Sequence, residues 1–449
     1  MKQCEVVYGK ERLQVDIDDR SLIGCYAPRR MQTGEGLNDP EQIRKESEDI
    51  MRRALASPIA LPPLAGLAKG GQKVAIVVDD YTRPTPTHLM LPLLFEELQA
   101  VGVRDEDITI VFAYGTHRFH TLEEKIKLLG GDRPEEGEAI LRKYRVWDHD
   151  CRDEANLRYL GKTSRGTPVH INRFVAEADL RILTGLIKPH SAAGYTGGGK
   201  AILPGVSSRQ TIISDHNYQA TGHPGARLGN IDGNPIRQDI EEAAGLVSPC
   251  FILNVILDEE KRVVDAVAGD MILAHRAGAE KLDDLVCVDI PEAADIVIAG
   301  CSSPTSTNLY QSTNALLNCV RLDQPIVKKG GVIILVSPCT EGIGGSGGYF
   351  PLISEPADAQ GILDRISQPG FFVDDQWAAQ QWAMILLQAE ILLVAEGISP
   401  ETAKAMKTIV FPSLEAAMQE ALGKKGKEAR ITVLTDSPYT IPRLTRVTR

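Results

Sequence analysis

The segment GYTGGGKAI, residues 194–202, has the spacing of a nucleotide-phosphate loop, in which a lysine follows a run of glycines. Such a loop places Ser or Thr directly after the lysine to bind magnesium, and then continues into a helix. Here Ala201 follows Lys200, and Pro204 with Gly205 would disrupt the expected helix. The sequence therefore argues against an ATPase loop. It favours a different interpretation, in which the glycines let the backbone approach a ligand closely and Lys200 points into a site.

Carboxylates, histidines, lysines and an arginine also gather in four short segments. They are Asp79, Asp80 and Arg83 in DDYTRPTP, His117 and His120 in THRFH, Lys188 and His190 in KPHS, and Asp215, His216 and Tyr218 in SDHNY. Histidines exchange protons near neutral pH and bind metals, and the arginine fork can hold a carboxylate. Any one of these residues could instead cap a helix or fill an exposed loop. Their clustering favours a shared site.

The first three of these segments each follow a run that predicts a β-strand. These runs are residues 73–80, 108–115 and 180–187, and residues 250–257 predict another strand. Helical patterns lie between them, and one opens with the capping-box spacing of Thr121 and Glu124. This alternation predicts an α/β fold with mainly parallel sheets, in which ligands bind beyond the carboxyl ends of the strands.

A second series of strand-like runs begins near residue 283. It comprises residues 285–290, 295–301, 330–339 and 429–436. We therefore predict two α/β domains, residues 1–282 for cofactor binding and catalysis and residues 283–449 as a second α/β domain, with the active site in the cleft between them. Residues 383–398 predict a buried amphipathic helix. The glycine-rich residues 341–350 predict a mobile surface loop.

Composition and charge argue against several classes of protein, including nucleic-acid-binding and membrane-spanning proteins. Apolar residues make up 43% of the 449 residues, charged residues 24%, and the net charge is −11, so the average field repels nucleic acid. No apolar run is long enough to span a membrane, and the N-terminus has no signal core. The eight cysteines contain no CxxC pair, so zinc and redox motifs are not predicted. We expect a cytoplasmic protein in which several of the cysteines pack as small apolar residues.

The segments DDYTRPTP, GTHR, KPHSAAGYTGGGKAILPGVSS and DHNY, in this order, resemble the lactate racemase family. The resemblance is continuous over most of the first predicted domain and extends more weakly into the second. Each motif alone is short, but four in order, with the lysine inside the third, are specific. The resemblance implies an isomerase, a racemase or epimerase that acts on a small 2-hydroxy acid.

The resemblance also implies a cofactor, the nickel-pincer nucleotide, a nicotinic-acid-derived mononucleotide whose two thio-acyl arms bind nickel. In the family the lysine of the GGGK motif is bound covalently to one arm, which implies this role for Lys200. The histidine of the DHNY motif binds nickel, here His216. The histidines of the GTHR and KPHS motifs form the acid–base pair, here His117 and His190. Cofactor-building enzymes are then implied as partners in the cell.

The remaining residues carried over by the resemblance surround the cofactor. Asp80, Thr82 and Arg83 are implied to lie at the cofactor, with Arg83 also at the substrate carboxylate. Gly198 and Gly199 let the backbone approach the cofactor. These residue types suit the chemistry, because hydride removal from C2 is easier once a base takes the hydroxyl proton, and a pyridinium ring beside a metal can accept hydride. Two bases on opposite sides then permit inversion.

The second half departs from the family at one substrate position. Tyr310 and Gln311 match the family, but Asn314 stands where a lysine that helps to hold the substrate is found. Asn314 is then either a substrate contact that favours a longer 2-hydroxy acid over lactate, or a neutral change on a helix. Trp377 and Trp382 are expected in a helix core. His120 and His149 match no motif and are expected at the surface.

Two alternatives remain open from the sequence. One is an oxidoreductase that releases the 2-keto acid after hydride transfer to a separate nicotinamide, although no GxGxxG motif follows a strand with an acidic residue about 20 positions later. The other is a non-catalytic protein that binds the nickel nucleotide. Such a protein would need the anchor and the metal ligand but not the pair formed by His117 and His190.

Overall fold

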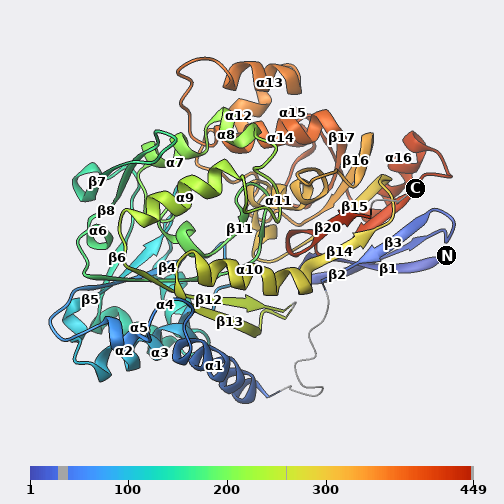
Figure 1. Ribbon diagram of the computed structural model, residues 1–449. Coiled ribbons are helices and arrows are strands. Elements are labelled where there is room, and N and C mark those ends of the chain that lie inside the picture. The colour runs from blue at the N-terminus through green and yellow to red at the C-terminus, as the bar shows by residue number, and fades with distance from the viewer. Residues whose placement is uncertain (29–38, 259, 446–449) are drawn as a thin grey trace.

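The computed structural model describes residues 1–28, 39–258 and 260–445. Two twisted sheets lie side by side, one at the left of Figure 1 around β4 and β5, the other at the right around β15 and β16. Helices lie on both faces of each sheet. The predicted fold class, α/β with mainly parallel sheets, is confirmed.

The first sheet has six strands in the order β13-β12-β9-β4-β5-β6. Their bounds are β4 (Val74–Asp79), β5 (Ile108–Ala113), β6 (Arg145–Asp148), β9 (Leu180–Leu186), β12 (Cys250–Leu257) and β13 (Val263–Asp270). Only the edge pair β12–β13 is antiparallel. The central strands β4, β5 and β9 are apolar and almost wholly buried, which is why each reads as a continuous apolar run.

Helices cover both faces of this sheet. They are α1 (Pro40–Ala56), α2 (Leu64–Leu67), α3 (Thr87–Ala100), α4 (Leu122–Gly130), α5 (Pro134–Lys143), α6 (Arg173–Ala176), α7 (Arg209–Asp215), α8 (Tyr218–Gly222), α9 (Pro235–Gly245) and α10 (Leu273–Val286). The predicted capping box is present: Thr121 Oγ1 accepts the Glu124 backbone N–H at 3.2 Å, and the Glu124 carboxylate accepts that of Thr121 at 2.8 Å. Two short antiparallel pairs complete this half, β7 (Leu157–Lys162) with β8 (Pro168–Asn172), and β10 (Pro189–His190) with β11 (Gly194–Tyr195).

The second sheet has eight strands, and only its β1–β2 pair is antiparallel. Its strands are β1 (Lys2–Gly9), β2 (Glu11–Ile17), β3 (Leu22–Tyr26), β15 (Ala294–Ser302), β16 (Val327–Val336), β17 (Ala389–Val394), β18 (Ile409–Phe411) and β19 (Ile431–Leu434). Its helices are α11 (Leu309–Val320), α12 (Tyr349–Ser354), α13 (Ala359–Ile366), α14 (Gln376–Gln388), α15 (Pro400–Ala405) and α16 (Leu414–Lys425). A separate parallel pair joins β14 (Cys287–Ile290) to β20 (Ile441–Leu444).

The first three strands of the chain belong to the second sheet. β1 pairs with β15, and β3 pairs with β19, so the N-terminus lies among strands from the end of the chain. The domain boundary at residue 282 stays a prediction. We propose that the second domain also includes residues 1–26, because their strands belong to its sheet.

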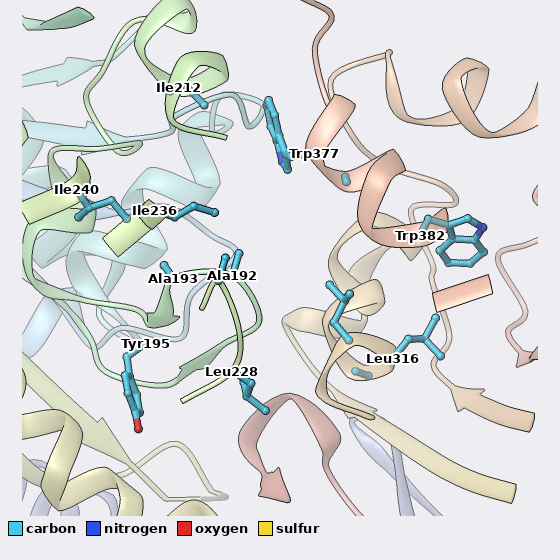
Figure 2. Close-up of a cluster of buried hydrophobic side chains, with 14 of the residues drawn as sticks. Ala192, Ala193, Tyr195, Ile212, Leu228, Ile236, Ile240, Leu316, Trp377 and Trp382 are labelled. Carbon is cyan, nitrogen blue, oxygen red and sulfur yellow. The ribbon is translucent and has the colours of Figure 1, made fainter. Parts of the chain in front are cut away.

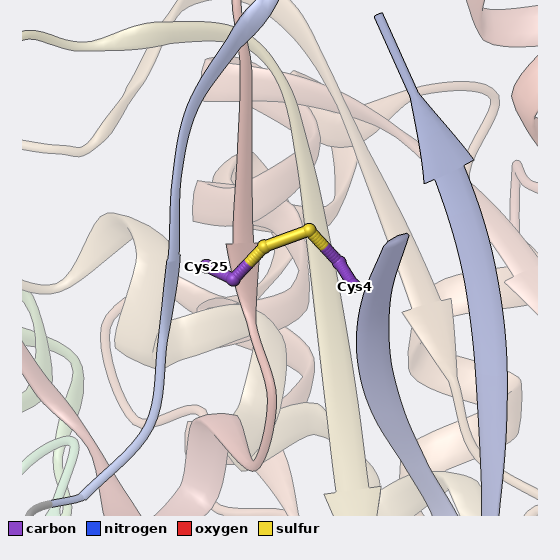
Figure 3. The surroundings of a disulfide bond; sticks show 2 residues. All are labelled: Cys4 and Cys25. Atoms are coloured by element: carbon purple, nitrogen blue, oxygen red, sulfur yellow. A yellow bond between two sulfur atoms is a disulfide. The ribbon is translucent and has the colours of Figure 1, made fainter. Parts of the chain in front are cut away.

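Two cysteines in these N-terminal strands are bonded to each other. A disulfide joins Cys4 of β1 to Cys25 of β3, as Figure 3 shows. This pairing was not predicted from the sequence, and the two strands are brought together by their places in the second sheet. Because disulfides persist mainly in oxidising compartments, the pair does not favour the predicted cytoplasmic location, which stays a prediction.

The two halves share one apolar core. Figure 2 shows residues of the first half, such as Ile212 and Ile236, on the same cluster as Leu316, Trp377 and Trp382 of the second. Two further cores cover the outer faces, one beneath α1 and α3 and one beneath α16. A shared core fixes how the two sheets face each other, and thereby fixes the cleft between them.

Residues 383–398 form the end of a helix and a strand, not the single helix predicted. Residues 383–398 were expected to form one helix, but α14 ends at Gln388 and β17 follows directly. In sequence, a strand buried between two neighbouring strands resembles a buried helix, because both are continuously apolar.

The glycine-rich loop, residues 341–350, lies largely at the surface, but Gly342 and Ile343 accept hydrogen bonds from the first residues of α11. No helix within the described residues is long and apolar enough to cross a membrane.

Trp382 gives a test of the shared core. Its side chain is fully buried, and its Nε1–H donates to the Met406 carbonyl at 3.0 Å. We expect Trp382→Ala to lower the free energy of unfolding by about 3–5 kcal/mol, because it leaves a large cavity. Leu387→Ala on the same helix, at a side chain that is 39% exposed, is the matched control and should change stability far less. Urea unfolding followed by circular dichroism measures both; equal losses would contradict this account of the core.

Candidate active site

A cavity lies between the carboxyl ends of β4, β5 and β9 and the helices α11 and α14. Most of the residues predicted for the site line it: Asp80, Thr82, Arg83, His117, His190, Lys200, His216, Tyr310, Gln311 and Asn314. Parallel strands bring their carboxyl ends to one edge of a sheet, so residues more than 100 positions apart in the chain meet there. The second half closes the cavity from the opposite side.

Asp80, which is buried, and His117, whose side chain is 25% exposed, form a pair at the exits of β4 and β5. Asp80 Oδ2 lies 2.5 Å from His117 Nδ1, and Asp80 Oδ1 accepts the Thr82 hydroxyl at 2.5 Å and the Thr82 backbone N–H at 3.0 Å. Burial alone would raise the pKa of Asp80, but the charge of a protonated His117 and the hydrogen bond to its ring, together with the charge of Arg83 and the Thr82 hydroxyl, outweigh burial and lower the pKa to about 2. The carboxylate therefore stays ionised and holds the proton of His117 on Nδ1.

This pairing leaves the other ring nitrogen of His117 available in the cavity. The Gln311 side-chain nitrogen of α11 lies 3.3 Å from His117 Nε2, so the second half reaches this nitrogen directly. A neutral histidine with its proton on Nδ1 carries a lone pair on Nε2. His117 is thus arranged as a proton acceptor.

His190 has the opposite arrangement. Its Nδ1 accepts the backbone N–H groups of Ala192 at 3.2 Å and Ala193 at 3.1 Å. Burial, followed by the positive charges of Lys200 and Arg83, holds the pKa of His190 well below its usual value. A neutral imidazole whose Nδ1 accepts two hydrogen bonds carries its proton on Nε2. His190 is thus arranged as a hydrogen-bond donor.

Lys200 lies in a tight 3₁₀ turn, Gly198–Ala201, and its side chain lines the cavity. Burial, followed by the charges of Arg237 and Arg83, lowers the pKa of its amine to about 7. Near neutral pH a large fraction of this amine is therefore unprotonated and nucleophilic.

Gly198 and Gly199 do not line the cavity. Gly198 has a φ of +59°, its N–H donates to Asn254 Oδ1 at 2.7 Å, and a Cβ there would meet the His275 ring at 2.9 Å. A Cβ on Gly199 would meet Ile240 at 3.1 Å. Both glycines therefore allow the turn to pack closely against the protein interior, and Lys200 projects from the opposite side. A contact of either glycine with a cofactor stays a prediction.

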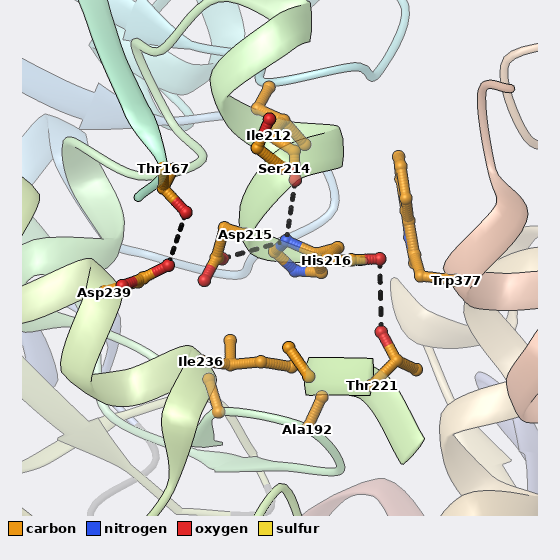
Figure 4. Close-up of polar contacts among 12 residues, drawn as sticks. Thr167, Ala192, Ile212, Ser214, Asp215, His216, Thr221, Ile236, Asp239 and Trp377 are labelled. Carbon is orange, nitrogen blue, oxygen red and sulfur yellow. Dashed lines mark hydrogen bonds and ion pairs between the residues drawn. The ribbon is translucent and has the colours of Figure 1, made fainter. Parts of the chain in front are cut away.

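His216 follows the last residue of α7, and Figure 4 shows its ring between Asp215 and Trp377. Its Nδ1 lies 3.2 Å from the Ile212 carbonyl and 3.0 Å from Asp215 Oδ2. A carbonyl accepts but does not donate, so the proton lies on Nδ1 and Nε2 keeps a lone pair. This is the tautomer in which an imidazole binds a metal through Nε2.

The second half contributes a polar wall. Trp377 Nε1–H donates to the Tyr310 hydroxyl at 3.1 Å, and the Ser191 hydroxyl donates to Asn314 Oδ1 at 3.3 Å. Asn314 lines the cavity, which is consistent with a substrate contact. Within the described part of the chain, no group of three or more His, Cys, Asp or Glu side chains could hold a metal ion by itself.

Trp377 and Trp382 are both in the core as expected, and Trp377 also lines the cavity, with its ring centroid 5.3 Å from that of His216. The sequence misplaced two histidines and missed one serine. His120 and His149 were expected at the surface but are 7% and 1% exposed. Their burial is possible because His120 Nε2 accepts the Tyr81 backbone N–H and His149 Nε2 donates to the Ser207 carbonyl. Ser191 was missed; its place in the KPHS motif was the available signal.

The fold and the cavity define an α/β enzyme with its site between two parallel sheets. The particular family follows from comparison with known proteins. Residues 8–229 match the lactate racemase N-terminal domain, and residues 290–440 match the lactate racemase C-terminal domain. The chain belongs to the lactate racemase family, and it is an isomerase.

Relatives and solved structures agree with this assignment. The chain is 32% identical to a lactate racemase of Thermoanaerobacterium thermosaccharolyticum over 99% of this chain and 100% of that protein. It is 31% identical to a lactate racemase of Lactiplantibacillus plantarum over 97% of this chain and 98% of that protein. The lactate racemase apoprotein from T. thermosaccharolyticum has a similar structure, with a TM-score of 0.86, 31% identity and coverage of 98% and 100%. A Thermotoga maritima protein at 19% identity and TM-score 0.68 shares the fold, with coverage of 90% and 98%.

The lowered pKa of Lys200 predicts a specific dependence of stability on pH. Between about pH 7, its pKa in the folded protein, and its ordinary value near 10.5, the unfolded chain binds more protons. Folding is therefore increasingly favoured as pH rises through this window, by up to about 1.4 kcal/mol per unit. We expect wild type to gain stability relative to Lys200→Met between pH 7 and pH 9.5, measured by urea unfolding. A difference that stays constant with pH would contradict the shift.

Proposed function

We propose that the protein inverts C2 of a 2-hydroxy acid, using a nickel-pincer nucleotide attached to Lys200 and bound through nickel by His216. The observation that carries this proposal is that the Lys200 amine, the His216 imidazole with a lone pair on Nε2, two further histidines and Arg83 all line one cavity. The relatives named above are lactate racemases, so lactate is the first substrate to assay.

The residues of the cavity fit this cofactor. An amine with a pKa of about 7 can attack an activated acyl group at neutral pH without a separate base. His216 offers Nε2 as one nitrogen ligand, which suits a metal whose other ligands come with the cofactor. Hydroxyl groups of Thr82, Thr184 and Ser191 on the cavity wall could hold polar parts of a nucleotide. When bound, the cofactor would supply a hydride acceptor, which is chemistry that no side chain of the cavity provides.

In this proposal His117 is the base. Its Nε2 takes the proton of the substrate hydroxyl, and Asp80 stabilises the imidazolium that forms, because the two are 2.5 Å apart and Asp80 is buried. The charge returns to neutral when the same nitrogen gives the proton back to the oxygen at C2.

His190 supports the reaction in a different way. Its Nε2–H donates a hydrogen bond to the oxygen at C2 and orients the substrate, because loss of its only proton would leave an unfavourable anion. The sequence treats His117 and His190 as an equivalent pair. Their different partners support unequal roles, because His117 Nδ1 contacts a carboxylate and His190 Nδ1 accepts two backbone N–H groups.

The remaining groups hold the substrate in place. Arg83 would bind the carboxylate at C1 through its guanidinium, whose own fixed contacts are the carbonyl and hydroxyl of Thr82 at 3.2 and 2.9 Å. Tyr310, Gln311 and Asn314 would close over it from α11. Closure matters because a 2-keto acid formed during inversion must be retained until C2 is restored.

The cofactor assignment can be tested by mass and metal content. The chain would be produced together with the cofactor-building enzymes of the family, alongside Lys200→Met. We expect a nickel-bearing mass adduct on wild type and none on the variant, measured by intact mass spectrometry and elemental analysis. A wild-type protein that carries no adduct while the cofactor is present would contradict the assignment. An adduct without inversion of any 2-hydroxy acid would instead indicate a binding protein or an oxidoreductase.

The unequal histidines give a second test. We expect His117→Gln to lower the rate of inversion by about 100-fold or more, because it removes the base. His190→Gln keeps an N–H donor and should cost about tenfold, a typical loss for a perturbed hydrogen bond. The exposed His223→Gln is the control and should match wild type. Chiral chromatography of lactate measures the rates, with nickel content confirmed for each variant. Equal losses at His117 and His190 would support two equivalent bases instead.

A further inference from the structure

A second cavity, of ≈ 760 Å³, lies beside the catalytic one. It is enclosed by the β1–β2 hairpin, the turn after β4, helix α4 and the carboxyl ends of β15 and β19. Its volume is in the range of small-molecule sites. Arg83 lines both cavities, so the two share a cationic wall.

Two lysines gather on one aromatic ring next to this wall. Lys261 lines the second cavity, and its Nζ lies 3.7 Å from the centre of the Tyr439 ring. Lys188 Nζ lies 4.9 Å from the same centre, and it donates a hydrogen bond to the Thr305 hydroxyl at 3.3 Å. Lys188 is only 5% exposed. Burying an ammonium group is costly unless a negative group lies near it.

The cations of this cluster lack carboxylate partners. Within the residues that the structure describes, no carboxylate oxygen lies within 4.0 Å of the charged nitrogens of Arg83, Lys188 or Lys261. Carboxylates do line the second cavity, those of Glu11, Glu124, Asp132 and Asp436, and Asp436 Oδ1 accepts the Ser302 backbone N–H at 3.2 Å. Asp436 acts on Lys261, and Asp79 and Asp80 act on Arg83, through charge at longer range. Among the described residues, none of the three cations therefore has a direct ion pair.

Two further observations describe the polar groups around this cavity. Burial, followed by the charges of Arg83 and Lys261, lowers the pKa of Lys188 to about 7. The Ser302 hydroxyl, on a residue that lines the second cavity, is buried without a hydrogen-bond partner among the described residues. A bound carboxylate would stabilise the ammonium groups and could accept this hydroxyl's hydrogen bond.

We propose that the second cavity binds a carboxylate beside Arg83 and Lys261, and that this is the distal carboxylate of the substrate. The substrate class would then be 2-hydroxy acids that carry a further carboxylate, a conclusion that rests on the proposed inversion at C2. One carboxylate occupies the catalytic cavity, and the other reaches past Arg83 to Lys261, with Lys188 adding positive charge from behind Tyr439. Lactate, with a methyl group in place of the second carboxylate, leaves this subsite empty.

Binding to the cofactor-free chain tests the subsite directly. The probes are 2-hydroxysuccinate, lactate and succinate, titrated by isothermal calorimetry at pH 7 into wild type, Lys261→Met, Lys188→Met and the control Lys404→Met, which lies exposed on α15. We expect wild type and Lys404→Met to bind 2-hydroxysuccinate at least about tenfold more tightly than lactate, the scale of one charge-assisted hydrogen bond. Lys261→Met should lose this preference while its lactate binding stays unchanged. Lys188→Met should weaken 2-hydroxysuccinate binding to a smaller degree.

Each other outcome overturns part of the proposal. Equal binding of 2-hydroxysuccinate and lactate by wild type, or equal weakening of both by Lys261→Met, removes the subsite. Succinate binding as tight as that of 2-hydroxysuccinate, with the same dependence on Lys261, assigns the cavity to a separate anion and not to the substrate. In the cofactor-loaded enzyme, the ratio of kcat/KM for the two hydroxy acids should follow the binding preference. Failure to invert either acid would overturn the proposed function, while the calorimetry still decides the subsite.

Discussion

The burial of ionisable groups between two parallel sheets is the constraint on which this site depends. Strands bring polar residues to their carboxyl ends, and the opposing half then removes those residues from water. Desolvation is the largest influence on the pKa of Lys200, Lys188 and His190, and it acts in the same direction on each, towards the uncharged form. The reactive state of these groups is therefore a property of the closed cleft and not of the individual side chains.

The exception is the pair of Asp80 and His117, where a short contact outweighs burial. The carboxylate is kept ionised and aligns the imidazole, so one buried negative charge persists among several cations. The same cavity can then hold an unprotonated amine at Lys200 and a histidine with a fixed tautomer at His117. Groups with such separated proton affinities are what acid–base chemistry at neutral pH requires.

The second half of the protein, which covers the cavity, is also stabilised by strands from the start of the chain. β1 and β3 come from the start of the chain and extend the second sheet, with the disulfide between Cys4 and Cys25 across them. The β1–β2 hairpin also encloses the second cavity, so residues at the extreme N-terminus help to shape the surroundings of Arg83. The shared apolar core then fixes the distance between α11 and the exits of β4, β5 and β9.

The sequence by itself determined the alternation of strands and helices, the parallel α/β class and most of the residues of the cavity. These follow from local signals: apolar runs, caps, and polar motifs that come directly after strands. It failed where the signal is not local. The strand after Gln388 resembles a helix in sequence because a central strand is apolar on both faces. His120 and His149 were misplaced because burial depends on what packs against a side chain. The membership of β1–β3 in the second sheet, the Cys4–Cys25 bond and the opposite tautomers of His117 and His190 were decided only by the tertiary structure. Each of these three features depends on contacts between residues distant in sequence or on backbone geometry. The spacing of residue types encodes neither the distant contacts nor the backbone geometry.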